Sequence, residues 1–103
     1  MEFNVLFLGT SKYVQAVAAI NAGYALTAYV DYDSVKGRKV YVSNQTNVFN
    51  FNYQIDGNMV YLNSATSPST AITIPTTYSS DAISFGCNAS ATGSCTVRFN
   101  FLD

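Results

Sequence analysis

The chain has few charged residues. Lys, Arg, Asp and Glu together make up 11 % of its 103 residues, less than half of the roughly 25 % that is usual for globular domains. With five basic residues and a net charge of −1, the chain offers no basic face that would release counterions from a phosphate backbone. We therefore expect no nucleic-acid partner.

Histidine is absent as well, and histidine is the commonest general base and metal ligand in proteins. The chain has six acidic residues, and no serine lies in a GxSxG nucleophile elbow. The stretch "DYDS" (31–34) has two acids on one strand face, but an EF-hand needs a twelve-residue loop with further acids. The sequence predicts a protein that is not an enzyme and that has no metal site and no cofactor.

Long apolar runs are missing too. No stretch of about 18 apolar residues occurs, so we expect no membrane span. The first residues, "MEFNVLFLGTSKY", lack the basic and then apolar order of a signal peptide. We expect that the protein reaches its site without such a signal, or that Met1 begins a mature domain.

Neutral polar residues take the place of charge. The chain has ten Asn, eleven Ser and ten Thr beside a 49 % share of hydrophobic residues. Neutral polar groups cost less to remove from water than charged groups. Such a surface suits a protein that packs against something else.

Alternation of apolar and polar residues predicts strands along most of the chain. In "VFNFNYQI", the residues Phe49, Phe51, Tyr53 and Ile55 share one face, and amide side chains occupy the other. The "DGN" that follows (56–58) predicts a hairpin, because Gly tolerates a positive φ angle. Other inward-facing sets are Phe3, Val5 and Phe7; Leu26, Ala28, Val30 and Tyr32; Ile83, Phe85 and Cys87; and Val97, Phe99 and Phe101.

Residues 11–22 fit two structures. Their alanines favour a short helix that ends at Gly23. The neighbouring strands and the "NAG" turn favour a strand, which we prefer. The chain as a whole (1–103) is then expected to form one all-β domain, an antiparallel β-sandwich or jelly roll of eight to nine short strands, with one short helix near residues 11–22 as the alternative.

The two cysteines, Cys87 and Cys95, flank a short Ser/Ala/Gly loop. If the strands on either side of this loop form a hairpin, both thiols point to the core side and a disulfide is expected, as its geometry requires close Cβ atoms. Two reduced core cysteines are the alternative. A disulfide would place the protein in an oxidising environment, on a virion or outside the cell.

Eight tyrosines and seven phenylalanines exceed the needs of so small a core. Exposed tyrosine is typical of protein interfaces, and tyrosine beside asparagine also suits a glycan. We predict a structural subunit of a virion (a capsid, decoration or tail protein) or of an extracellular filament, acting as a homo-oligomer or together with other structural proteins; the alternative is a carbohydrate-binding or adhesin module. The candidate surface residues are Leu6, Tyr24, Tyr29, Asn50, Asn52 and Tyr78.

The terminal segments 1–8 and 96–102 are the expected contact elements. A strand at a chain end is often the edge of a sheet, and an edge offers unpaired backbone groups to a neighbour. Each of these two segments carries a single charged residue, which protects an edge poorly.

Overall fold

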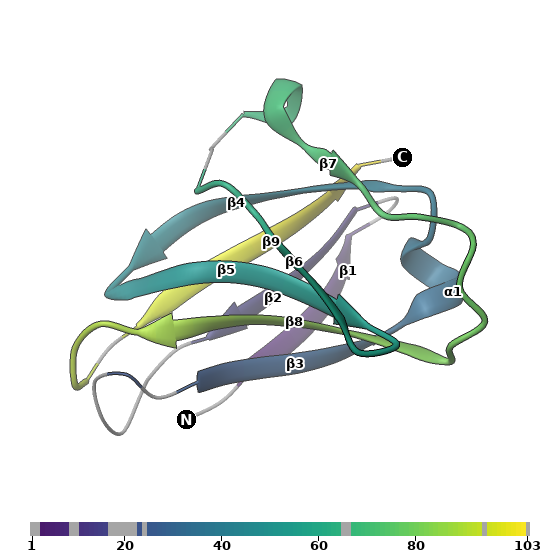
Figure 1. Ribbon diagram of the computed structural model, residues 1–103. Helices are drawn as coiled ribbons and strands as arrows, with labels where there is room; N and C mark the ends of the chain where they lie inside the picture. Colours follow the sequence, from purple (N-terminus) through teal and green to yellow (C-terminus); the bar gives the residue numbers. More distant parts are fainter. Residues whose placement is uncertain are drawn as a thin grey trace.

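Antiparallel strands make up most of the protein, as the alternation predicts (Figure 1). The computed structural model describes residues 3–8, 11–16, 23, 25–64, 67–93 and 95–102, with 3–8 and 11–16 described at the level of the backbone. Within these ranges nine strands form two sheets. The all-β prediction is confirmed.

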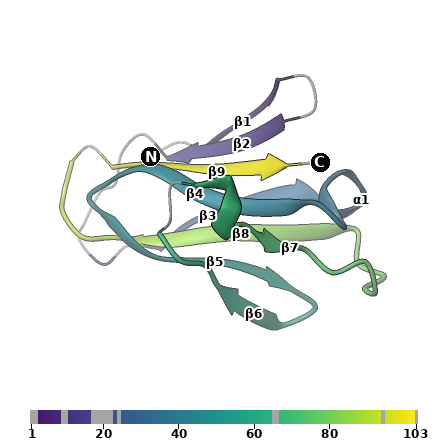
Figure 2. The same cartoon turned by 90° about the horizontal axis from the view of Figure 1, so that it is seen from above.

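The two sheets lie one above the other (Figure 2). The five-stranded sheet has the order β1 (Phe3–Leu8), β2 (Ser11–Ala16), β9 (Thr96–Leu102), β4 (Lys39–Thr46) and β7 (Ile72–Thr73). The four-stranded sheet has the order β3 (Ala25–Asp31), β8 (Ala82–Ala89), β5 (Val48–Ile55) and β6 (Asn58–Tyr61). The two short helical turns are α1 (Tyr32–Val35) and η1 (Pro68–Thr70).

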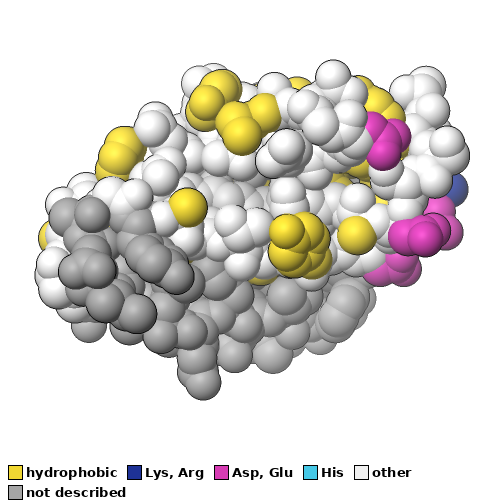
Figure 3. All heavy atoms as spheres, turned by 60° about the horizontal axis from the view of Figure 1, so that its bottom comes forward, with side chains coloured by type: hydrophobic (Ala, Val, Ile, Leu, Met, Phe, Trp, Pro, Cys, Tyr) yellow, Lys and Arg dark blue, Asp and Glu magenta, His cyan; other side chains and the backbone are white. Residues whose placement is uncertain are grey.

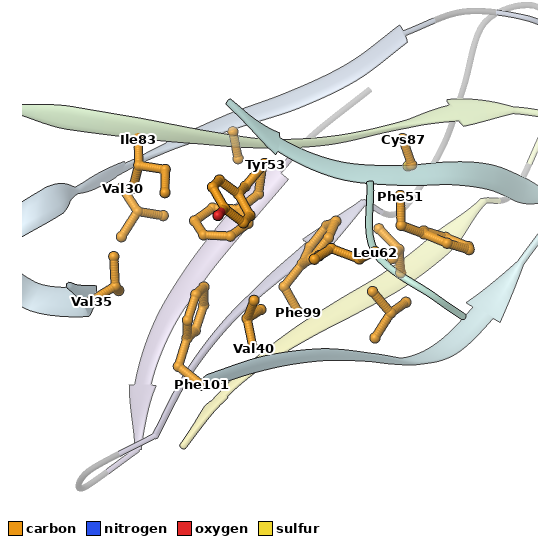
Figure 4. Packing of buried hydrophobic residues seen from close by; sticks show 14 of the residues in the cluster. Val30, Val35, Val40, Phe51, Tyr53, Leu62, Ile83, Cys87, Phe99 and Phe101 are labelled. Atoms are coloured by element: carbon orange, nitrogen blue, oxygen red, sulfur yellow. The ribbon is translucent and has the colours of Figure 1, made fainter. Parts of the chain in front are cut away.

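The core lies between the sheets, where the inward-facing residues of both meet (Figure 4). Phe85 of β8 is its centre: its ring centroid lies 5.4 Å from that of Phe99 and 5.0 Å from that of Phe101, both on β9. The Tyr53 ring of β5 lies 6.2 Å from Phe85. Since Phe85, Phe99 and Phe101 are fully buried, these aromatic contacts join one sheet to the other.

Strand phase follows the sequence pattern in β3 and β9. Leu26, Ala28 and Val30 are buried while the residues between them are exposed. Phe99 and Phe101 are likewise buried, and their neighbours in β9 are half-buried. Period-two alternation therefore predicted which face of these strands meets the core.

The β5–β6 hairpin is also as predicted. Asp56 and Gly57 have φ angles of 50° and 77°, and Ile55 pairs with Asn58 across the turn. Two positive φ angles in a two-residue loop define the type I′ turn, which Asp-Gly favours.

Residues 11–16 form a strand. β2 pairs antiparallel with β1 along its whole length, so the helix considered for this region is wrong over these residues, and 17–22 lie outside the described residues. A helical turn occurs instead at α1, just after β3, where Tyr32 and Val35 are buried.

Two expectations about pairing are wrong. β9 was expected at an edge, but it lies between β2 and β4, while β1 is an edge strand as predicted. β8 and β9 were expected to form a hairpin, but they belong to different sheets. The loop between Cys87 and Cys95 therefore crosses from one sheet to the other.

Candidate functional site

Charge is concentrated at one end of the sandwich. The acidic side chains that the structure describes are Asp31, Asp33, Asp56 and Asp81, all exposed. Asp31 ends β3 opposite Ala82, the first residue of β8; Asp56 in the β5–β6 turn accepts a hydrogen bond from Ser80. In Figure 3 the acidic side chains gather at this end, away from most of the exposed apolar atoms.

The outward surface of the four-stranded sheet is uncharged over most of its area. Tyr29 on β3 is 74 % exposed, and on the opposite edge strand, β6, Met59 and Tyr61 are 47 % and 64 % exposed. Cross-strand register places neutral residues between these edges. We call this surface the tyrosine face; it comprises Thr27, Tyr29, Asn52, Gln54, Met59, Tyr61, Ser84 and Gly86.

A depression of about 300 Å³ lies in the middle of the tyrosine face. Gly86 lies in its floor, where β8 carries no side chain. A Cβ atom built on Gly86 would lie 3.1 Å from the Leu26 carbonyl oxygen and 3.3 Å from Asn52 Oδ1, so a larger residue would crowd both. The face thus has protruding rings at its edges and a dip between them.

A second, larger hollow of about 490 Å³ lies beyond β6, where the chain leaves the four-stranded sheet. We call it the aromatic hollow. The exposed rings of Phe49 and Tyr61 line it, and Val48, Phe51 and Leu62 supply its apolar wall.

Polar groups complete the lining of the aromatic hollow. They come from Gln45, Asn50, Asn63 and Ser64. Gln45 Nε2 donates a hydrogen bond to the Ser64 carbonyl at 3.4 Å. Gln45 Oε1 is buried away from solvent and has no hydrogen-bond partner among the described residues.

Two β-bulges, one in β5 and one in β4, contribute residues to the lining of the aromatic hollow. In β5, two residues (50 and 51) lie opposite one residue of β8, between the pairs Phe49↔Asn88 and Asn52↔Gly86. In β4, a similar irregularity lies between Ser43 and Thr46. Bulges re-aim side chains and are common beside functional sites.

Asparagine occupies the special backbone position at each bulge. Asn44 in β4 has a φ angle of 52° and Asn50 in β5 has 56°. Among residues with a side chain, Asn is one of the few that adopt this left-handed region readily. The bulge at Asn50 also explains a wrong expectation: Phe49, predicted to face the core, is 41 % exposed.

The sequence-predicted surface residues do not form one site. Tyr29 and Asn52 belong to the tyrosine face, and Asn50 lines the aromatic hollow. Tyr78 is half-buried against the core, and its backbone N–H donates to the Tyr32 hydroxyl at 3.4 Å. Leu6 lies on the edge strand β1, opposite Tyr13, and Tyr24 lies outside the described residues.

Sequence reasoning missed Phe49, Met59, Tyr61 and Gln45 as surface candidates. A signal was present in "SNQTNVFN", where Asn recurs at 44, 47 and 50. All three have positive φ angles, and this recurrence of a residue that tolerates them marks a segment of broken strand regularity.

Cys87 and Cys95 are both buried and are free thiols in the structure. Burial raises the pKa of the Cys87 thiol to about 12, and the nearby Cys95 adds to the shift. The Cys95 thiol contacts the Ala91 carbonyl oxygen at 3.6 Å. A thiol with so high a pKa stays protonated at neutral pH and is a poor nucleophile.

Among the residues described, no group of three or more Asp, Glu, Cys or His side chains is placed to hold a metal ion. In the same part of the chain no helix is long and apolar enough to cross a membrane. Comparison with protein-family models, with curated proteins and with solved structures found no match for this chain.

Proposed function

We propose that the protein is a non-enzymatic structural subunit of a virion or an extracellular filament, and that it assembles with further copies of itself. The observation that carries this proposal is the tyrosine face. It exposes Tyr29, Met59 and Tyr61 around neutral side chains, and interfaces are enriched in tyrosine and methionine and depleted in lysine and glutamate.

The shape of the tyrosine face suits a second copy of itself. A twofold interface brings the same surface patch of two subunits together. The exposed ring of Tyr29 stands at one edge, and the depression over Gly86 lies beside it. A twofold axis through the face would place the ring of each subunit over the depression of the other.

We propose a location on a virion or outside the cell. This location follows from a disulfide that we propose between Cys87 and Cys95, because disulfides persist in oxidising environments. The bond would join the two sheets rather than two strands of one hairpin. Both side chains are buried and near enough for Cys95 to affect the pKa of Cys87. Mass spectrometry after alkylation, with and without reductant, tests the pairing; two thiols alkylated after unfolding without reductant would contradict it.

Sedimentation velocity tests self-assembly. We expect the wild type to form oligomers as its concentration rises, and Tyr29→Lys to shift it towards the monomer, because the new charge would lose its water at the interface. Thr46→Lys is the control, since Thr46 is an exposed strand residue of the other sheet and lies opposite the neutral Thr96. A wild type that stays monomeric at high concentration would overturn the proposal.

The second candidate function is that of a carbohydrate-binding or adhesin module. The aromatic hollow favours it, because two exposed rings and several amide side chains line one concavity. Both functions are compatible in one protein, since the hollow and the centre of the tyrosine face are separate places on the surface.

A further inference from the structure

We propose that the aromatic hollow binds one or two pyranose rings of a neutral oligosaccharide, through stacking on Tyr61 and Phe49 and hydrogen bonds to Asn50, Asn63 and Gln45. This inference rests on the second candidate function and does not depend on self-assembly. It assigns a binding site to the hollow beyond β6, which shares Tyr61 with the edge of the tyrosine face.

The size and wall of the hollow fit such a ligand. Its volume of about 490 Å³ lies within the range of roughly 300–1,000 Å³ that is common for small-molecule sites. The wall is apolar where Phe49 and Tyr61 expose their rings. A pyranose has an apolar face of C–H groups, and an aromatic face offers it contact area at little cost in side-chain entropy.

Amide groups supply the polar contacts. Each Asn or Gln side chain offers two donors and an acceptor, and vicinal sugar hydroxyls both donate and accept. Gln45 also lines the hollow, and its Nε2 donates a hydrogen bond to the Ser64 carbonyl oxygen at 3.4 Å.

The absence of charge in the hollow selects a neutral ligand. None of the described residues that line it is Lys, Arg, Asp or Glu, and the described acids lie at the α1 end of the sandwich. A sialic or uronic acid would have to lose water around its carboxylate without gaining a cation, which is costly.

The backbone conformation at Asn50 is a second indication that the hollow is a binding site. A regular strand would direct Phe49 to the core in phase with Phe51. The bulge, held by Asn50 at a φ angle of 56°, instead exposes the large apolar ring of Phe49 beside Tyr61. An exposed Phe49 ring contributes less to the stability of the fold than a buried ring would. Stacking of a ligand on this ring accounts for its exposure.

A glycan array and isothermal titration calorimetry test the inference. The array would contain neutral oligosaccharides of glucose, galactose, mannose and N-acetylhexosamines beside sialylated and uronic-acid glycans. We expect binding to a neutral oligosaccharide. With the strongest neutral binder from the array, Tyr61→Ala should weaken the affinity at least about tenfold. Tyr29→Ala removes an even more exposed tyrosine from outside the hollow and should leave the affinity unchanged.

A second variant keeps the test independent of large changes in the fold. Asn50→Gly preserves the positive φ angle and removes the amide, so we expect the affinity to fall about three- to tenfold. Circular dichroism would confirm that each variant is folded. Binding only to charged glycans, no binding at millimolar concentration, or equal losses in Tyr61→Ala and Tyr29→Ala would overturn the inference.

Failure of glycan binding and failure of assembly are separable in these experiments. Tyr29→Ala should weaken association in sedimentation velocity without affecting glycan affinity, and Asn50→Gly should do the reverse. A monomer that binds a neutral glycan would overturn assembly alone, and an oligomer that binds none would overturn the hollow alone.

Discussion

Single side chains join the two halves of this sandwich. Phe85 lies against Phe99 and Phe101 with ring centroids 5.4 and 5.0 Å apart, so one residue of β8 contacts two residues of β9 across the core. Phe49, which belongs to the same sequence pattern as the buried aromatics, contributes to the surface instead. Residues of one type therefore differ greatly in their effect on stability.

Phe99→Ala should lower the free energy of unfolding by about 3–5 kcal/mol, the cost of deleting a fully buried aromatic side chain. A domain of this size has about 5–15 kcal/mol in total, so the loss is large. Phe49→Ala is the matched control and should cost about 1 kcal/mol or less, because the ring is largely exposed. Urea denaturation measures both, and equal losses would contradict the assigned strand phase.

The Cys87 thiol should make the reduced protein less stable in alkaline solution. Its pKa is raised from the ordinary 9.0 to about 12 in the folded state, so the folded protein retains a proton that the unfolded chain releases. The stabilisation is complete below about pH 9 and is lost as the pH rises towards about 12. Urea midpoints in reductant from neutral to alkaline pH measure the effect.

Cys87→Ala is the control for this pH dependence, since it removes the thiol and leaves the other ionisable groups in place. The variant should lose less stability than the wild type between these pH values. Parallel curves for the two proteins would show that another group titrates instead.

At the scale of elements, turns and edges decide how the strands are used. The β5–β6 hairpin depends on positive φ angles at Asp56 and Gly57. The β1–β2 hairpin forms one side of the five-stranded sheet, with β1 at its edge. The β5–β6 turn affects the stability of the fold locally, whereas the β1 edge offers unpaired backbone groups to a neighbouring molecule.

Gly57→Ala should lower stability by about 1–2 kcal/mol through backbone strain alone. The φ angle of Gly57 is +77°, and a Cβ atom there would meet nothing within 4 Å, so no clash contributes. Gly57→Asn should cost less, because Asn tolerates this region. Thermal unfolding of the three proteins measures the order, and an Ala variant as stable as the wild type would rule out the strain.

The β1 edge is open to a test by charge. Leu6→Lys should lower assembly while the fold stays intact, because lysine on an edge strand discourages pairing with another strand. Leu6→Thr adds no charge and keeps a residue that suits strands, so it should assemble more like the wild type. Sedimentation velocity alongside circular dichroism compares them, and unchanged assembly in Leu6→Lys would exclude β1 as a contact.

At the scale of the whole molecule, charge and apolar exposure are separated. The described acids lie at the α1 end, and Asp33 forms an ion pair of 2.9 Å with Lys36 there. Tyr29, Met59 and Tyr61 are exposed on a sheet face that is uncharged over most of its area and carries Asp31 at its α1 end. This separation predicts association through burial of apolar and neutral polar groups rather than through ion pairs.

Assembly should therefore respond little to salt. Raising the sodium chloride concentration from about 0.1 M to about 1 M shortens the Debye length from about 10 Å to about 3 Å, which weakens contacts between surface charges and not the burial of apolar area. We expect similar distributions of sedimentation coefficients at both concentrations. Dissociation at high salt would point to a contact made by the charged end.

The sequence by itself determined the class of the fold, the inward faces of β3 and β9, and the I′ turn at Asp56 and Gly57. These features are local: period-two alternation follows from the geometry of an extended chain, and a two-residue loop selects its own turn residues. No knowledge of strand partners is needed to derive them.

The tertiary structure alone decided which strands pair. The sequence pattern around Cys87 and Cys95 fits a hairpin and a crossover equally well, because the inward phase is the same in both. Strand partners are chosen by contacts between distant segments, so β9 came to lie between β2 and β4. The bulge at Asn50 depends on pairing with β8 in the same way; alternation predicted Phe49 to be buried, and pairing exposed it to form the aromatic hollow.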